Sequence, residues 1–255
     1  MSDWDAVTYD RVSDVQLAWA LDQLERLPLT GDEVVLDAGC GSGRVTAELV
    51  TRLPRGRVYG VDASAAMVEH ASARLRQAAT ILRQDLVELA LPELVDVVFS
   101  NATFHWVLDH DALFAALWRA MRPGARLVAQ CGGAGNIDAF LTVADLVARE
   151  EPFAPRFDGW LHPWYFATAE DTAARLERAG FTNVDCWLAP GHVTPAEPRN
   201  FVQTVTLRHH LDVLPDELRP LFVDRVLAEC GEPLVLDYVR LNMSARRGSG
   251  HGSAL

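Results

Sequence analysis

A glycine-rich stretch directly after a short apolar run constrains the fold of this chain more than any other feature. The run is Val34–Asp37, and residues 37–43 then read Asp-Ala-Gly-Cys-Gly-Ser-Gly. Apolar residues at positions 45, 49 and 53 follow at helical spacing, and Pro54 ends that pattern. A strand, a glycine loop and a helix in this order place backbone amides at a helix start, where a ligand can approach them closely.

Short β-branched runs alternate with longer helical patterns along the rest of the chain, which is typical of βαβ units around a parallel sheet. We expect further strands at 57–61, 81–82, 95–99, 126–130, 182–188 and 234–244. Helical patterns cover about 64–75, a segment that begins near 109, and 132–149, 169–180, 197–213 and 215–230. The predicted fold class is α/β, with a doubly wound, seven-stranded, mostly parallel sheet.

Two segments interrupt the strand and helix rhythm and predict a small helical cap. The first, about 132–168, begins with Gly132–Gly135 and ends in a stretch rich in proline and aromatic residues. The second is about 195–231. We expect residues 1–245 to form a single domain that includes these cap elements, and residues 246–255, with their Gly and Ser, to form a flexible tail.

Charge and cysteine usage restrict the partners and the compartment. The 255 residues include 23 basic and 35 acidic side chains, a net charge of −12, which is the wrong sign for binding nucleic acid or an anionic membrane. The four cysteines form no Cys-x-x-Cys pair, and neither a signal peptide nor an apolar run of roughly 18 residues is found. We therefore expect a soluble, cytoplasmic protein with no nucleic-acid or membrane partner.

Three aspartates follow three successive predicted strands: Asp37, Asp62 and Asp85. Each alone is also typical of a helix cap or a turn. Together at one edge of the sheet they suit a cationic nucleoside, because a carboxylate at Asp37 repels a pyrophosphate and attracts a cation. Asp62 is placed for ribose hydroxyls and Asp85 for an adenine amine. Arg44 stands where a dinucleotide loop needs glycine or alanine, so a nicotinamide cofactor is disfavoured and S-adenosylmethionine is favoured.

These residues resemble the class I S-adenosylmethionine-dependent methyltransferases, whose acid, Gly-x-Gly-x-Gly and second acid are matched over about 27–130. Within that family the chain is similar to the trans-aconitate and juvenile hormone acid methyltransferase group. The closer motifs are Trp4-Asp5 with Tyr9, the turn at 62–67, and Asn101–Trp106 after the fourth predicted strand. The resemblance implies S-adenosyl-L-methionine as cofactor and S-adenosyl-L-homocysteine as product.

The resemblance also implies a set of cofactor-binding residues. The glycine loop surrounds the methionine moiety, the residues after the second and third strands hold the ribose and the adenine, and an N-terminal helix, about 1–26, covers the cofactor. The residues implied are Tyr9, Asp37, Gly39, Gly41, Gly43, Asp62, Ala63, Asp85, Leu86 and Asn101.

The acceptor is expected to be a small molecule, and a carboxylate is favoured. A carboxylate arrives ionised and needs no base, whereas a phenol or a carbon acid needs one. In the related acid methyltransferases a glutamine and a tryptophan hold the carboxylate, and Gln16 and Trp106 fall at matching places. His105 is a candidate polar contact or base, or else a cap for the helix near 109. Gln16, His105 and Trp106 are the predicted catalytic residues.

Methylation of a phenolic, amine or carbon centre in secondary metabolism is the alternative within enzymes, and a non-catalytic nucleoside-binding scaffold is the alternative outside them. The aromatic cap segment predicts an apolar acceptor wall with Arg156 and His162 as polar handles. The predicted substrate-binding residues are Gln16, Trp106, Arg156, Trp160, His162 and Trp164. No metal site is expected, because Asp109–Asp111 is typical of a helix start and His209 and His210 point to different helix faces.

Overall fold

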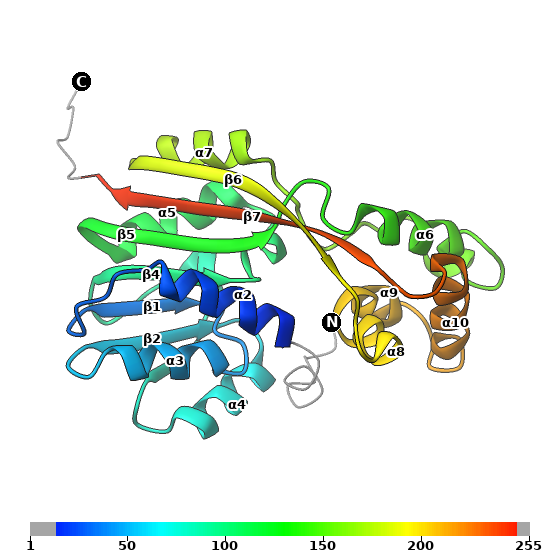
Figure 1. Cartoon of the computed structure of the whole chain (residues 1–255), viewed down its shortest axis with the longest axis horizontal. Coiled ribbons are helices and arrows are strands. Elements are labelled where there is room, and N and C mark those ends of the chain that lie inside the picture. The colour runs from blue at the N-terminus through cyan, green and yellow to red at the C-terminus, as the bar shows by residue number, and fades with distance from the viewer. Residues whose placement is uncertain (1–13, 249–255) are drawn as a thin grey trace.

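The computed structural model describes residues 14–248, and within them seven strands form one sheet in the order β3-β2-β1-β4-β5-β7-β6. Strands β1 to β5 are parallel, and β7 runs antiparallel to both of its neighbours (Figure 1). The predicted α/β, doubly wound, mostly parallel sheet is confirmed. The strands are β1 (Val34–Ala38), β2 (Arg57–Asp62), β3 (Thr80–Arg83), β4 (Val95–Asn101), β5 (Met121–Gly132), β6 (Phe181–Val193) and β7 (Leu236–Arg247).

Helices cover both faces of the sheet because its central strands are buried on both sides. Val35 and Phe99 pack with Leu49 of α3 and with α2, whereas Leu36 packs on the opposite face with Leu113 of α5. All five residues of β1 are buried. The helices are α2 (Asp14–Glu25), α3 (Arg44–Arg52), α4 (Ala65–Leu75), α5 (His110–Ala120), α6 (Asp138–Ala148), α7 (Ala169–Arg178), α8 (Pro198–Phe201), α9 (Arg208–Asp212) and α10 (Arg219–Cys230).

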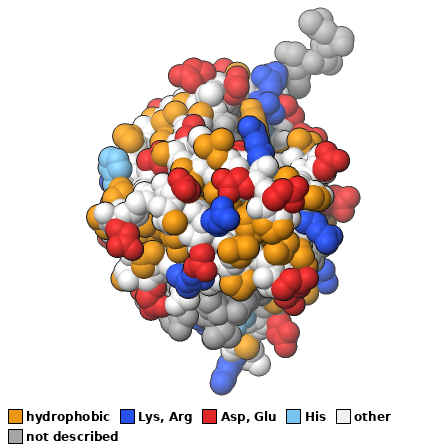
Figure 2. All heavy atoms as spheres, turned by 90° about the vertical axis from the view of Figure 1, so that its right-hand side faces the viewer, with side chains coloured by type: hydrophobic (Ala, Val, Ile, Leu, Met, Phe, Trp, Pro, Cys, Tyr) orange, Lys and Arg blue, Asp and Glu red, His pale blue; other side chains and the backbone are white. Residues whose placement is uncertain are grey.

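Helices α6, α8, α9 and α10 form the cap at one end of the sheet, together with the ends of β6 and β7 (Figure 1). The cap has its own hydrophobic cluster, in which Phe153 and Phe222 are completely buried. Its outer face mixes hydrophobic side chains with charges of both signs (Figure 2). Between residues 14 and 248, no helix combines the length and the apolar character that a bilayer crossing requires.

Several predicted boundaries were wrong. Strand β7 continues through Arg247, which lies over the ring of Trp118, so residues 246 and 247 belong to the sheet and not to a tail. Helix α6 begins at Asp138, because β5 runs to Gly132 and a turn follows it. The predicted helix over 197–213 is interrupted by a π-helical turn at Val202–Thr206.

The loops after β1 and β4 contact each other at the carboxyl edge of the sheet. Gly39 has a φ of +80°, and a β-carbon built on it would lie 2.1 Å from Oγ1 of Thr103. The Thr103 hydroxyl donates a hydrogen bond to the carbonyl of Gly39, 3.2 Å away. Gly41 also has a positive φ, of +52°, but an added β-carbon would meet nothing within 4 Å. The first glycine therefore serves packing, and the second leaves open space.

Gly39→Ala and Gly41→Ala should separate these two roles. An alanine in the left-handed region costs about 1–2 kcal/mol at either position, and the collision with Thr103 adds about 1–3 kcal/mol at Gly39 alone. Urea denaturation of the ligand-free proteins should show Gly39→Ala as the less stable by at least about 1 kcal/mol. Equal losses of unfolding free energy would contradict the close packing of the two loops.

Candidate functional site

A cavity of about 410 Å³ lies at the carboxyl ends of β1, β2 and β4, within the volume range of roughly 300–1,000 Å³ usual for ligand sites. Such edges of open parallel sheets are where ligands bind in doubly wound folds. The cavity brings together many of the residues predicted for the cofactor. Its walls include Gly39, Gly41, Asp62, Ala63, Asp85, Leu86 and Asn101, and also Met67, Ala102, Thr103 and Trp106.

Asp62 is held rigidly on the cavity wall by two backbone amides. The N–H of Gly41 donates to Oδ2 and the N–H of Ser64 donates to Oδ1, each at 2.9 Å. A carboxylate has about four acceptor sites, so these two amide bonds do not by themselves use all the acceptors of Asp62. The residues therefore fit a ribose. The two carboxylate oxygens of Asp62 are held in place on the cavity wall, and Gly41 beside them has no side chain that would fill the cavity.

Asp85 combines the two roles that the sequence left open. Its carboxylate accepts the N–H of Val87 at 3.1 Å and caps the short 3₁₀ helix Leu86–Glu88. The same exposed side chain lines the cavity, next to Leu86, which is buried. A polar acceptor beside an apolar wall suits a purine ring with an exocyclic amine.

Asp37 lies in a smaller hollow of about 60 Å³, which also contains Gly39, Gly41 and Asn101. The side chain is 2% exposed and accepts a hydrogen bond from the hydroxyl of Thr46 at 2.6 Å. Burial raises the pKa of Asp37 to about 7; the hydrogen bond from Thr46 opposes this rise and the charge of Asp62 adds to it. A bound cation would stabilise the ionised form of this carboxylate.

Asn101 connects the N-terminal helix to the sheet at this point, because its Nδ2 donates to the carbonyl of Gln16 at 3.0 Å. Gly43, which was predicted to bind the cofactor, is not among the residues that line these two hollows. It lies behind the cavity, with a φ of +81°, and an added β-carbon would be 3.1 Å from Cβ of Ala71 and 3.0 Å from Leu75 on α4. Its role is helix packing. Tyr9 lies outside the described residues.

A second cavity, of about 70 Å³, adjoins the first and shares Ala102 and Trp106 with it. All three predicted catalytic residues line it, and so does Trp164 from the predicted acceptor set. Apart from Ala102, the remaining walls come from the cap and from β7. They are Asn136, Ile137, Leu141, Phe166, Val205, Thr206, Tyr238 and Arg240.

Arg240 on β7 is the functional candidate that the sequence analysis missed. Its guanidinium is nearly buried, at 5% exposure, and lies 4.6 Å from the ring of Trp19. Nε donates to Oε1 of Gln130 at 3.2 Å, and Gln130 in turn donates to Asn242 at 2.7 Å. The chain thus fixes a positive charge on the wall of the second cavity. Its only signal in the sequence is that Arg240 and Asn242 share the strand face of Leu236 and Tyr238.

His105 lines the second cavity and does not cap a helix. Its Nδ1 accepts the N–H of Gly132 at 3.3 Å, so that the neutral ring carries its proton on Nε2. Burial, with the positive charge of Arg240 adding to it, lowers the pKa of His105 well below its usual value. The predicted capping role belongs instead to Asp109, which accepts the N–H of Ala112 at 2.9 Å.

Three residues predicted to bind the acceptor do not line the second cavity. Arg156 lies on the 3₁₀ helix Ala154–Arg156 and is exposed. The apolar residues on either side of this helix, Phe153 and Phe157, pack into the hydrophobic cluster of the cap. Trp160 and His162 lie behind Trp164, with ring centroids 6.3 and 4.6 Å from that indole. Aromatic density in the sequence located the cap but not the side of the cap that faces the acceptor.

Relatives of known activity match this chain along almost its whole length. Residues 36–129 match a family described as a methyltransferase domain. The chain is 32% identical to the trans-aconitate 2-methyltransferase of Methylobacterium nodulans, over 97% of this chain and 99% of that protein. It is 30% identical to the trans-aconitate 2-methyltransferase of Methylobacterium radiotolerans, over 88% of this chain and 87% of that protein.

Solved methyltransferases share the fold at lower identity. Phosphoethanolamine N-methyltransferase 2 of Haemonchus contortus, in complex with S-adenosyl-L-methionine, has a TM-score of 0.64 at 18% identity, covering 96% of this chain and 57% of that one. An S-adenosylmethionine-dependent methyltransferase of Aquifex aeolicus has a TM-score of 0.57 at 17% identity, covering 96% and 99%. With its sheet, its cavity and its full-length relatives, the chain belongs to the class I S-adenosylmethionine-dependent methyltransferases, in the group of the trans-aconitate methyltransferases.

Proposed function

We propose that this methyltransferase methylates a carboxylate oxygen of a small organic acid, which binds in the second cavity. The guanidinium of Arg240 is the observation that carries the proposal. Hydrogen bonds and the Trp19 ring fix its orientation, and a planar guanidinium matches the two oxygens of a carboxylate. The relatives named trans-aconitate 2-methyltransferase support an acid acceptor, and trans-aconitate is the first acid to test.

The hydrogen-bonding character of the second cavity favours a carboxylate over the alternative acceptors. A phenol or a carbon acid must lose a proton, and a base near pH 7 serves that step best. His105 is unsuited to it, because burial keeps its pKa low and Nδ1 already accepts the Gly132 amide. A carboxylate arrives ionised and needs donors only, which Arg240 and the Nε2–H of His105 supply.

We assign the larger cavity to the cofactor, with Asp62 toward the ribose, Asp85 toward the adenine and Asp37 toward the cationic methionine moiety. When bound, S-adenosylmethionine supplies an electrophilic methyl group, which forms a bond to the carboxylate oxygen as its bond to sulfur breaks. The protein's contribution is to align the two ligands and to exclude water. Ala102 and Trp106, which line both cavities, mark the place where the ligands meet.

Incubation with S-adenosylmethionine and a panel of acids, phenols and amines, followed by mass spectrometry, tests the proposed acceptor class. Methyl esters are expected, and methylation confined to phenols or amines would overturn the proposal.

The four cysteines are free thiols, and this supports our further proposal of a reducing, cytoplasmic location.

Asp37→Asn should lose cofactor affinity and gain stability. With a pKa of about 7, Asp37 is mostly protonated at pH 6 and mostly ionised at pH 7.5, so S-adenosylmethionine should bind about tenfold more weakly at pH 6. Asn should remove this pH dependence. Because the pKa is raised above the unfolded value, the wild-type loses stability as pH rises toward 7, and ligand-free Asp37→Asn should unfold at higher temperature at pH 8.

Calorimetric titration with S-adenosylmethionine at pH 6 and pH 7.5 measures the change in affinity. Thermal unfolding of the ligand-free proteins at pH 8 measures the change in stability. Ser42→Ala, in the same loop, is the control for the thermal measurement, since it leaves the carboxylate in place. A pH-independent affinity in the wild-type would contradict an ionised Asp37 opposite the cofactor's charge.

Arg240→Met should raise the KM for the acid acceptor about 10- to 100-fold, because hydrogen bonds to charged groups contribute about 1.5–3 kcal/mol. Steady-state kinetics with S-adenosylmethionine at saturation measure this change. Arg246→Gln, an exposed residue of the same strand, removes the same charge outside the cavity and should leave KM unchanged. An unchanged KM in Arg240→Met would contradict the assignment of Arg240 to acceptor binding. A raised KM in Arg156→Gln would instead support Arg156, the residue predicted from the sequence.

His105→Gln should retain turnover within about tenfold, since glutamine keeps an N–H donor, whereas loss of a general base costs about 10²–10⁴-fold. In the wild-type, kcat with both substrates saturating should be flat from about pH 6 to pH 9, because burial holds the pKa of His105 well below its usual value and the ring stays neutral in turnover. An acid limb near pH 6.5 that disappears in the variant would instead identify His105 as a base.

A further inference from the structure

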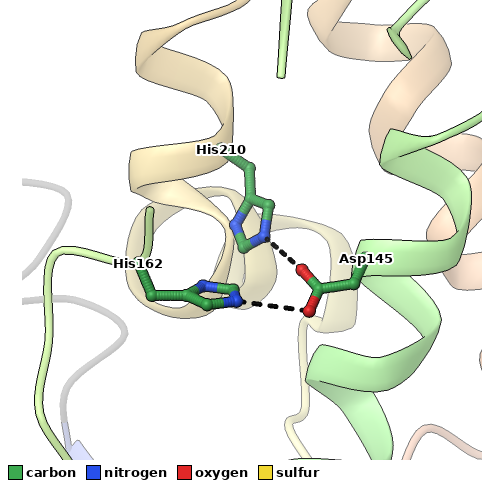
Figure 3. Close-up of side chains that lie close together, drawn as sticks. All are labelled: Asp145, His162 and His210. Carbon is green, nitrogen blue, oxygen red and sulfur yellow. Dashed lines mark hydrogen bonds and ion pairs between the residues drawn. The ribbon is translucent and has the colours of Figure 1, made fainter. Parts of the chain in front are cut away.

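Three side chains from separate cap segments converge on one point. They are Asp145 of α6, His162 of the segment before α7, and His210 of α9 (Figure 3). Nε2 of His162 lies 3.2 Å from Oδ2 of Asp145, and Nε2 of His210 lies 3.8 Å from Oδ1. One ligand atom from each residue lies within 4.8 Å of the other two. Neither the cofactor cavity nor the acceptor cavity includes these residues.

His210 has a buried ring that hydrogen bonding does not explain. The side chain is completely buried, and among residues 14–248 neither of its ring nitrogens has a hydrogen-bond partner. The separation of 3.8 Å from Asp145 exceeds hydrogen-bonding distance. A buried polar group without a partner costs about 1–3 kcal/mol, so a ring that points at a carboxylate without bonding to it requires another explanation.

We propose that Asp145, His162 and His210 bind a divalent transition metal ion, and that zinc is the ion they suit best. Two imidazoles and one carboxylate are typical zinc ligands, whereas magnesium and calcium prefer oxygen-only sets. With metal–ligand bonds of about 2.0–2.1 Å, tetrahedral ligand atoms lie about 3.4 Å apart. The nearest separations are of this size, 3.2 Å from His162 to Oδ2 of Asp145 and 3.8 Å from His210 to the other oxygen, Oδ1, and a set with one ligand atom per residue lies within 4.8 Å.

Aromatic rings surround the cluster and exclude water from one side. The ring centroids of Trp160 and Phe222 lie 4.6 and 5.9 Å from that of His210. Asp145 and His162 are half-buried, which leaves the other side open for an ion to enter. Because the ligands come from three cap segments, a bound ion would hold these segments together beside Trp164, which lines the acceptor cavity. The ion's role is therefore positional, and no chemical step passes through it.

The sequence analysis, which predicted no metal site, considered Asp109–Asp111 and His209 with His210, and not the three residues proposed here. The structure agrees that His209 and His210 diverge: the ring of His209 lies 4.9 Å from Trp106 and its Nδ1 lies 3.6 Å from Asp212. The partners of His210 are 48 and 65 positions earlier in the chain. No local spacing motif connects residues so far apart.

Zinc titration of chelator-treated full-length protein, in competition with a chromophoric chelator, tests the proposal. The wild-type should bind one ion per chain and unfold at higher temperature when zinc is present. Asp145→Asn and His162→Gln should each weaken zinc binding at least tenfold, since even loss of an outer-shell partner costs 10- to 100-fold. His192→Gln, an exposed histidine of β6 outside the cluster, should bind zinc as the wild-type does.

Cobalt gives a second measurement that does not depend on activity. Bound Co²⁺ should show visible absorption bands that are lost in both cluster variants and kept in the control. The two variants alter half-buried side chains, so their metal-free unfolding midpoints should stay close to that of the wild-type. Zinc affinity unchanged in Asp145→Asn and His162→Gln, or no saturable uptake by the wild-type, would overturn the proposal and leave a hydrogen bond between His162 and Asp145 with His210 packed beside it. Loss of zinc binding in the His192→Gln control would also overturn it.

Discussion

The rest of the site depends on the close approach of the loops after β1 and β4. In the sheet β1 lies between β2 and β4. The chain leaves β1 toward β2, whereas β4 and the strands after it lie on the opposite edge of β1, so the loops after β1 and β4 flank a topological switch point. Thr103 occupies the space that a side chain at Gly39 would need. That contact holds the loop that carries Ala102 and Trp106, the residues common to both cavities, where the proposed cofactor and acceptor would meet.

The cofactor side was predictable because its residues follow one another closely in the chain. Strand, loop and acid repeat within residues 34–86, and parallel strands bring every such loop to one edge. Gly43 shows the limit of this reasoning: the motif identified the glycine, but its lack of a side chain serves packing against α4. A glycine pattern records that space is needed and not whether a ligand or a helix takes it.

The acceptor side was not predictable in the same way, because its residues meet only through long-range pairing. Arg240 reaches the cavity through the antiparallel register that sets β7 beside β5, and its partner Gln130 is 110 positions away. Arg156, among aromatic residues in the sequence, was the cation predicted to bind the acceptor, yet it is exposed. Alternation along β7 showed that Arg240 and Asn242 share a face, but it did not show what that face covers.

The two cavities carry opposite charges although the chain as a whole is acidic. Asp37, Asp62 and Asp85 lie toward the proposed cofactor, and Arg240 lies toward the proposed acceptor. A sulfonium is favoured beside the carboxylates and disfavoured beside a guanidinium, and the reverse holds for an organic acid. In the proposed function each ligand is therefore directed to its own cavity, and Ala102 and Trp106, which line both cavities, lie between the anionic acceptor and the cationic methyl donor. The proposed reaction joins opposite charges, so the arrangement that would sort the two ligands would also bring the reacting atoms together.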